Sequence, residues 1–228
     1  MQAIGVDLSK NHFGFCHIDK EGKTTLRYVY FKEYLQKERK ENLKNPRQYF
    51  KTIEREVKEN EFTFEKIKFS YDNKNYNQIQ SDALKSKLNL NLLEEYLLSI
   101  DGPKFVVLED YVMQGGKIVQ LVHVGESFKY QFTDKEKWKS VILFLCPVQT
   151  WRSSMCGHIH SAPGCKQTPY EKIDIALRDN DKTYQFIKTL NETDDVVKDL
   201  IDCYGLARMH KHYNEIFLAQ YSNRIFIF

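Results

Sequence analysis

The amino-acid sequence predicts an α/β fold in which helices cover both faces of a mixed sheet. Three strand patterns follow one another at the start of the chain, and strand and helix patterns alternate later. Two of the later strands, "KFVVL" and "VILFL", are almost entirely apolar, as is typical of strands that are buried on both faces. These patterns together indicate one sheet that contains both antiparallel and parallel strands.

The first part of the chain predicts three strands and two helices. Apolar runs and turn residues place the strands near 3–7, 13–18 and 24–31. A charged run at about 34–60 and an amphipathic leucine pattern at 82–100 are interpreted as helices. The join between them, "SYDNKNYNQIQ", is rich in Asn and Lys and is interpreted as a flexible insertion.

The second part of the chain alternates between strands and helices. The predicted elements are a strand at 105–108 with a glycine-rich loop after it, a helix at 116–132, a strand at 140–148 with a polar loop after it, a helix near 170–177 and a final helix from about 194. We expect a single domain, 1–228, with an insertion at approximately 32–90.

Composition narrows the function classes. The 228 residues are 42% hydrophobic and 14% aromatic, which is enough for one large domain with a real core. The longest apolar run, Val141 to Val148, is too short to span a bilayer. The N-terminus has no signal-like apolar segment, and the five cysteines lack framework spacing. We therefore expect an intracellular protein of the cytoplasm, the nucleoid or a viral replication compartment. A net charge of +3 permits a polyanionic partner without requiring one.

Two acidic residues stand where predicted strands end. Asp7 ends the first strand, and Glu109 ends the "FVVL" strand. Each acid alone is an ordinary strand-ending residue. On neighbouring strands of one sheet, however, both could point into the same cleft, because chemistry in α/β sheets collects beyond the carboxyl ends of the strands.

The final helix carries two more acids of interest. Thr193 is a candidate N-cap, and acids in the first turn offset the helix dipole. Asp199 and Asp202 lie about 60° apart on the helix surface, roughly opposite its apolar stripe. Periodicity alone predicts that this face is solvated, although the small Gly205 would let another group approach.

Four carboxylates in one cleft would need a cation. Like charges repel and raise one another's pKa. Mg²⁺ prefers carboxylate oxygens and keeps water ligands for a phosphate. Two such ions can stabilise both the attacking and the leaving oxygen of phosphodiester hydrolysis.

The segments "IGVDLSKNHFGFCHID", "FVVLEDYVMQGG" and "KDLIDCYGLA" resemble, in this order, those of the RuvC-type Holliday junction resolvases. The resemblance implies an RNase H-like fold with a five-stranded mixed sheet and a site of four acids. These acids would be the catalytic residues and metal ligands Asp7, Glu109, Asp199 and Asp202. It also implies Mg²⁺ as cofactor, with Mn²⁺ as a substitute, four-way junction DNA as substrate, and a homodimer. Asp110 directly follows Glu109, but the motif favours Glu109 as the ligand.

Four residues are candidates for binding DNA. Tyr111 stands near the place of the aromatic wedge of that family, although ordinary packing would also explain it. Lys117 follows the glycine pair and could touch phosphate, and the default is a solvated lysine. Arg152 and Lys166 could face phosphates from a mobile loop. The apolar surface of helix 116–132 predicts either a dimer face or simple core.

Other interpretations remain open at this point. A zinc site is one alternative for the polar loop after the 140–148 strand. Its candidate ligands would be Cys156, His158, His160 and Cys165. Their spacing, C-x-H-x-H-x₄-C, matches no usual structural zinc pattern. The alternative enzymes are other RNase H-like nucleases, of the ribonuclease H or transposase type. A protein that binds junctions without cutting them belongs to a different class.

Overall fold

The computed structural model describes residues 1–8, 12–33, 50–59, 62–71, 78–110, 134–156, 168–212, 214 and 225–227. Its elements in chain order are β1 (Gln2–Leu8), β2 (His12–Ile18), β3 (Thr24–Glu33), β4 (Phe50–Glu59), β5 (Thr63–Tyr71), α2 (Gln78–Ser99), β6 (Lys104–Asp110), α4 (Lys135–Trp138), β7 (Val141–Pro147), α5 (Val148–Cys156), α6 (Pro169–Leu177), α7 (Lys182–Thr189), α8 (Asp194–Arg208), a 3₁₀ turn (Met209–His212) and β8 (Ile225–Ile227).

The strands form one mixed sheet in the order β4-β5-β3-β2-β1-β6-β7-β8. Strands β1, β2 and β3 form an antiparallel meander, and β6 and β7 run parallel to β1. These five central strands are the predicted RNase H-like sheet, so the predicted fold class is confirmed. Three further strands widen the sheet: β5 and β4 beyond β3, and β8 beyond β7.

One helix prediction is wrong on the β3 side of the sheet, where β5 and β4 add two strands. The charged run at 34–60 was predicted to be helical, but its described part, β4, is a strand. Strand β4 pairs with β5, and β5 pairs in parallel with β3. Glu, Lys and Arg favour helices only weakly, so the hydrogen bonds and cross-strand pairs of a sheet override that preference.

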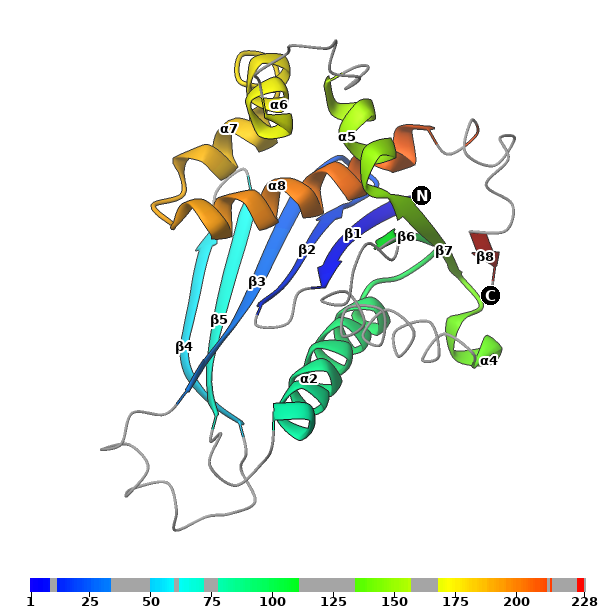
Figure 1. Ribbon diagram of the computed structural model, residues 1–228. Helices are drawn as coiled ribbons and strands as arrows, with labels where there is room; N and C mark the ends of the chain where they lie inside the picture. Colours follow the sequence, from blue (N-terminus) through cyan, green and yellow to red (C-terminus); the bar gives the residue numbers. More distant parts are fainter. Residues whose placement is uncertain are drawn as a thin grey trace.

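Helices cover both faces of the sheet. Figure 1 shows α8 lying across the strands, with α5, α6 and α7 beside it. The core on this side includes Tyr28, Phe144 and Trp151, and the core on the other side includes Phe15 and Trp138. Helix α2, predicted at 82–100, packs its leucines into the second core. The sheet is therefore buried on both sides, as its apolar strands predicted.

Helix α8 lies unusually close to the sheet. A Cβ atom on Gly5 of β1 would lie 2.1 Å from the carbonyl oxygen of Cys203 and 2.3 Å from the backbone nitrogen of Ala207. A Cβ atom on Gly14 of β2 would lie 2.8 Å from Cys203 Sγ. Gly5 therefore lets the backbone of α8 rest directly on β1, and Gly14 makes room for the Cys203 side chain over β2.

Two of the predictions for the second half need correction. The polar loop predicted after the 140–148 strand begins with helix α5, and helix α7 was not predicted. The helices near 170–177 and from about 194 are confirmed. Thr193 occupies the N-cap position of α8, but its side chain makes no capping hydrogen bond. The helix predicted at 116–132 lies outside the described residues. Among the described helices, none is long and apolar enough to cross a membrane.

Candidate active site

Asp7 and Glu109 occupy neighbouring positions at the same edge of the sheet. Val6 of β1 is in parallel register with Leu108 of β6, so the two acids directly follow a paired position. Asp7 is half-buried, and only 9% of Glu109 is exposed. The sequence-based prediction that these acids meet beyond adjacent strand ends agrees with this arrangement.

Helix α8 adds Asp202 to this edge. Only 9% of Asp202 is exposed, and Glu109 and Asp199 are close enough for their charges to raise its pKa. Burial is the largest cause of the rise, and the pKa of Asp202 is raised to about 7. The prediction from periodicity alone, that this face of α8 is solvated, is therefore wrong for Asp202.

Gly205 allows another helix of the same chain, α5, to pack closely against α8. A Cβ atom on Gly205 would lie 2.4 Å from Met155 Sδ and 2.5 Å from Trp151 Cε3, both on α5. Helix α8 is thus covered by the sheet on one side and by α5 on another. This second cover explains why an acid opposite the main apolar stripe is buried.

Two groups oppose the rise in the pKa of Asp202. The hydroxyl of Tyr170 donates to both carboxylate oxygens, at 2.9 and 2.8 Å. Nη2 of Arg152 lies 3.8 Å from Oδ2. Both interactions favour the charged form of the carboxylate, so they lower the pKa that burial raises.

Glu109 has a similar environment. Burial raises the pKa of Glu109, while the charge of Arg152 and the indole N–H of Trp151 lower it. Within the described part of the chain, that indole nitrogen is buried and lacks a hydrogen bond of full geometry. Glu109 and Asp202 therefore share Arg152 as their nearby cation.

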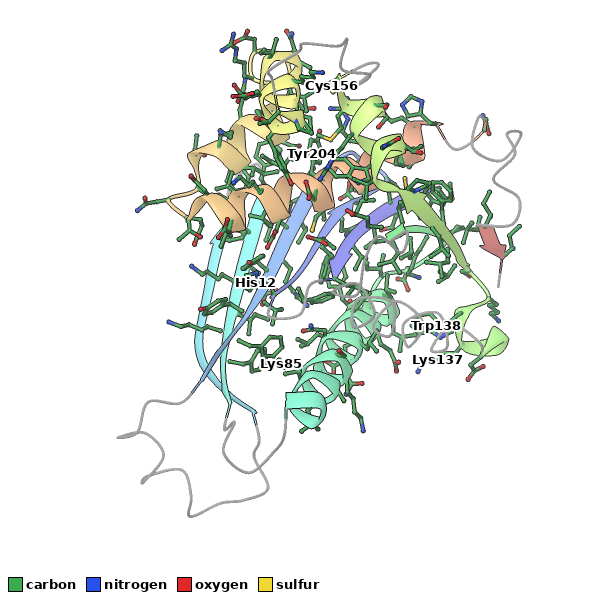
Figure 2. All side chains as sticks on the ribbon, viewed as in Figure 1. His12, Lys85, Lys137, Trp138, Cys156 and Tyr204 are labelled. Atoms are coloured by element: carbon green, nitrogen blue, oxygen red, sulfur yellow. The ribbon has the colours of Figure 1, made fainter. Side chains whose placement is uncertain are left out.

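Asp199 lies at the more open side of the site. Its side chain is 25% exposed. Oδ2 accepts a hydrogen bond from the Tyr28 hydroxyl at 3.0 Å and lies 3.4 Å from Nδ1 of His12. His12 is on the sheet next to α8 (Figure 2) and stacks on Tyr30, with ring centroids 5.4 Å apart.

Asp7 is linked to these acids electrostatically. Burial is the main cause that raises the pKa of Tyr28 and Tyr170, and the charge of Asp7 adds to the rise in both. These tyrosines contact Asp199 and Asp202, so Asp7 lies within electrostatic range of both hydrogen-bonded pairs. The structure thus brings all four predicted acids to one edge of the sheet.

Arg152 is not part of a loop. It lies on α5, with its guanidinium carbon 5.0 Å from the Trp151 ring centroid and 5.5 Å from that of Tyr170. The loop prediction is therefore wrong at this residue.

The predicted DNA-binding residues Tyr111, Lys117 and Lys166 lie outside the described residues. So do His158, His160 and Cys165 of the zinc alternative; Cys156 ends α5, and its thiol donates to the Arg152 carbonyl at 3.2 Å.

Sequence reasoning missed several partners of the acids. His12, Tyr28 and Tyr170 each contact Asp199 or Asp202. Tyr170 is 32 residues from Asp202, and Tyr28 is 171 residues from Asp199. No local pattern links positions so far apart, so only the packing of α6 and the sheet against α8 reveals these contacts.

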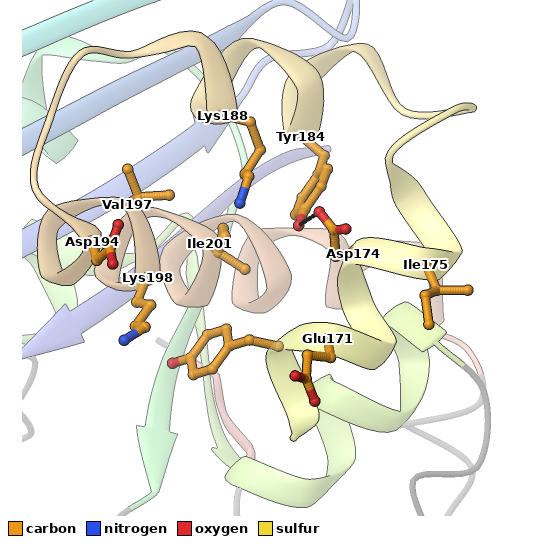
Figure 3. Close-up of a pocket in the computed structure, with 10 residues that line it drawn as sticks. Glu171, Asp174, Ile175, Tyr184, Lys188, Asp194, Val197, Lys198 and Ile201 are labelled. Carbon is orange, nitrogen blue, oxygen red and sulfur yellow. Dashed lines mark hydrogen bonds between the residues drawn. The ribbon is translucent and has the colours of Figure 1, made fainter. Parts of the chain in front are cut away.

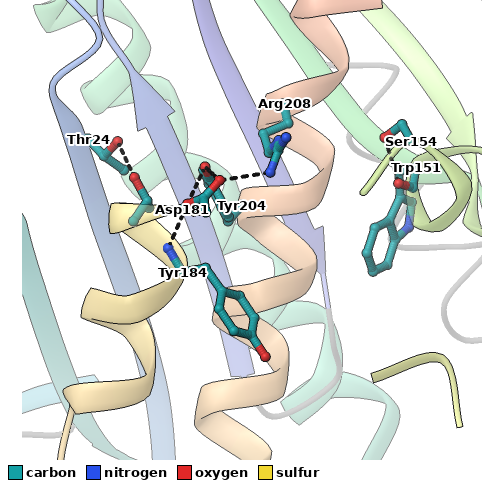
Figure 4. A network of polar contacts seen from close by, with 8 residues as sticks. Thr24, Trp151, Ser154, Asp181, Tyr184, Tyr204 and Arg208 are labelled. Carbon is teal, nitrogen blue, oxygen red and sulfur yellow. Dashed lines mark hydrogen bonds and ion pairs between the residues drawn. The ribbon is translucent and has the colours of Figure 1, made fainter. Parts of the chain in front are cut away.

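A network on the far side of α8 holds the helix in place. Asp181 accepts hydrogen bonds from Tyr204 Oη at 2.7 and 2.9 Å and from Arg208 Nη1 at 2.8 Å, and it caps α7 through the Tyr184 N–H (Figure 4). The carboxylate thereby joins the start of α7 to the last turns of α8. It steadies the helix that carries Asp199 and Asp202.

A pocket of about 530 Å³ adjoins the site between α6, α7 and α8 (Figure 3). Tyr170 lines it, together with the bases Lys188 and Lys198 and the acids Glu171, Asp174 and Asp194. The Tyr170 side chain therefore touches both the pocket and, through its hydroxyl, Asp202. The pocket's mixed charges favour no particular ligand.

The donor set suits a hard divalent cation. Four carboxylates lie along one edge, and burial is the main cause that raises the pKa values of Glu109 and Asp202, so a cation beside them would favour their charged forms. Among the residues that the structure describes, however, no three His, Cys, Asp or Glu side chains are close enough to share one ion. The chemistry of the donors fits Mg²⁺, and the acids would have to draw together around it.

Comparisons with known proteins give structural resemblances alone. No family model matches the sequence, and no curated protein matches it. RuvC of Thermus thermophilus is 12% identical, with a TM-score of 0.41 over 95% of this chain and 97% of that chain. The yeast mitochondrial Holliday junction resolvase Ydc2 is 14% identical, with a TM-score of 0.45 over 93% of this chain and 81% of that chain. Both solved structures bear names from the class of proteins that the sequence motifs resemble.

Proposed function

We propose that the protein is a structure-selective endonuclease that resolves four-way DNA junctions by phosphodiester hydrolysis. The observation that supports this most is the placement of Asp7, Glu109 and Asp202 along one edge of the sheet. Two acids follow a paired position of parallel strands, and α8 sets the third near Glu109. The motif resemblance supports the same function.

The four acids would hold the metal. Asp7, Glu109, Asp199 and Asp202 offer hard oxygen donors, for which Mg²⁺, or Mn²⁺ in its place, is the matching cofactor. Bound there, such ions would supply an activated water and stabilise the charge on the attacking and leaving oxygens.

The neighbouring side chains position the acids. Tyr170 donates to both oxygens of Asp202, and Tyr28 donates to Asp199, so each carboxylate is held in one orientation. One of the acids would also accept a proton from the attacking water. Burial of Glu109 and Asp202 limits competing water and strengthens electrostatic interactions at the scissile phosphate.

DNA contacts and assembly complete the proposal. Tyr111, Lys117, Arg152 and Lys166 would contact the junction. Resolution into two duplexes requires two symmetric nicks, and a two-fold dimer presents two sites with matching symmetry. The helix predicted at 116–132 is the proposed dimer face.

A cleavage assay tests the proposal. Purified protein is incubated with a four-way junction, a duplex and an RNA–DNA hybrid, with Mg²⁺ or EDTA. We expect cutting of the junction alone, and only with Mg²⁺. Preference for the hybrid would support a ribonuclease instead, and junction binding without cleavage under any metal would support a non-catalytic protein.

Acid variants test the site. Asp7→Asn, Glu109→Gln and Asp202→Asn should each abolish cleavage and leave junction binding largely intact, because the changes remove ligands without removing bulk. Asp179→Asn is the matched control, since that side chain is 79% exposed and lies in the turn between α6 and α7. Cleavage near the wild-type rate would remove the substituted acid from the site.

A further inference from the structure

Arg152 occupies the position of a counter-cation for two buried acids. Its Nη2 is 3.8 Å from Asp202 Oδ2, and its charge acts on Glu109 as well. The rings of Trp151 and Tyr170 hold the guanidinium in this place. Only 24% of the side chain is exposed, so water screens this charge less than it would at the surface.

The contact between Arg152 and the acids is loose. A tight hydrogen bond between a guanidinium and a carboxylate measures about 2.7–2.9 Å, whereas this pair is 3.8 Å apart. Nε of Arg152 is buried and has no hydrogen-bond partner among the described residues. Among the described residues, Arg152 thus acts on the acids through space rather than through a tight hydrogen bond.

A divalent ion on the same acids would conflict with this arrangement. Mg²⁺ binds carboxylate oxygens at about 2.0–2.1 Å, so an ion on Asp202 would lie within a few ångströms of the guanidinium. Two cations at that separation in a half-buried site repel strongly. They cannot both remain fully engaged with Asp202 and Glu109.

We infer that Arg152 competes with the divalent metal for Asp202 and Glu109, and that metal binding releases its guanidinium toward a phosphate of the DNA. This inference rests on the proposed function, because it takes these acids as metal ligands. It gives Arg152 a role before DNA arrives, in addition to the phosphate contact proposed from the sequence. An arginine that only binds DNA would leave metal affinity unchanged.

Calorimetric titration of the full chain with Mn²⁺, without DNA, tests the inference. The titration is done at about pH 8.5, so that protons do not compete for the carboxylates. Arg152→Gln should bind Mn²⁺ about 5- to 150-fold more tightly than the wild type, the usual range for two coupled sites. Arg152→Lys keeps the charge and should stay closer to the wild type.

Arg178→Gln is the matched control. Arg178 is also an arginine near an acid, with Nε 3.8 Å from Oδ2 of Asp179, and its side chain is 58% exposed. Its loss changes the net charge equally, so its Mn²⁺ affinity should equal that of the wild type. An equal gain in both variants would indicate a general charge effect and overturn the inference.

A second measurement uses the wild-type arginine. In a Trp138→Phe background, Trp151 is the remaining tryptophan, and its ring contacts the guanidinium. Saturating Mg²⁺ should change its emission, because the cation leaves the ring face. Metal binding with unchanged emission, or equal affinity in Arg152→Gln and wild type, overturns the inference alone. No metal binding in any variant overturns the proposed metal site as well.

Discussion

Gly5→Ala should damage the site without touching any of its acids. The added Cβ would lie 2.1 Å from the Cys203 carbonyl oxygen and 2.3 Å from the Ala207 nitrogen, whereas ordinary contact begins at about 3.4 Å. Both atoms belong to the backbone of α8, so rotation of a side chain cannot relieve the clash. The helix must move away from β1 by about 1 Å.

The size of the effect follows from that movement. Overpacking of this kind costs about 1–3 kcal/mol of the free energy of unfolding, which lowers the Tm of a protein of this size by about 2–12 °C. Asp199 and Asp202 move with α8, while Asp7 and Glu109 stay on the sheet. A misplacement of about 1 Å between reacting groups reduces the rate by about 100-fold.

The assay compares thermal unfolding and junction cleavage, with Gly14→Ala as the graded comparison. At Gly14 the added Cβ would meet the thiol of Cys203 at 2.8 Å rather than backbone, so both losses should be smaller. Cleavage is measured well below the Tm of each variant, which separates misplacement from unfolding. A Gly5→Ala protein with wild-type Tm and cleavage rate would refute the close packing of α8 on β1.

Three further predictions concern the chemistry, the DNA and the assembly. Tyr170→Phe removes both hydrogen bonds from the hydroxyl to Asp202 and should raise the pKa of Asp202 above about 7. Because cleavage needs the carboxylate, the acidic limb of the pH–rate profile should move to higher pH, and an unmoved limb would argue against the contact. Junction affinity should fall as salt rises, and neutralising Arg152 and Lys166 together should reduce the salt slope by about two. An unchanged slope would show that neither residue contacts phosphate. The mass in solution should be near twice the chain mass of 27.1 kDa, with paired nicks in opposing arms; a monomer on the junction would contradict the dimer.

Patterns within single elements made the central sheet predictable. The strand patterns of β1, β2, β3, β6 and β7 were identified because burial on both faces leaves a local apolar signature. Strand β4 was not identified from the sequence, because its charged residues favour a helix. It forms a strand by pairing with β5. Helix α5 was also missed, since its short polar sequence resembles a loop.

The candidate site also has features that the sequence predicts and features that it does not. Asp7 and Glu109 could be placed together from strand ends alone, because parallel neighbours end at the same edge. The burial of Asp202 could not, since it depends on α5 packing against Gly205. The partners Tyr170 and Tyr28 come from distant parts of the chain, and no spacing rule connects them with α8.

The contact of Gly5 with α8 has a consequence for the timing of activity. The two segments are about 200 residues apart in sequence, so they can meet only after the residues up to Ala207 have left the ribosome. Such distant contacts also slow folding, because a long loop must close before they form. Until α8 docks on the sheet, Asp199 and Asp202 are not at the edge where Asp7 and Glu109 lie. A growing chain therefore carries Asp7 and Glu109 early but brings all four acids to one edge of the sheet only after α8 has been made and has docked on β1.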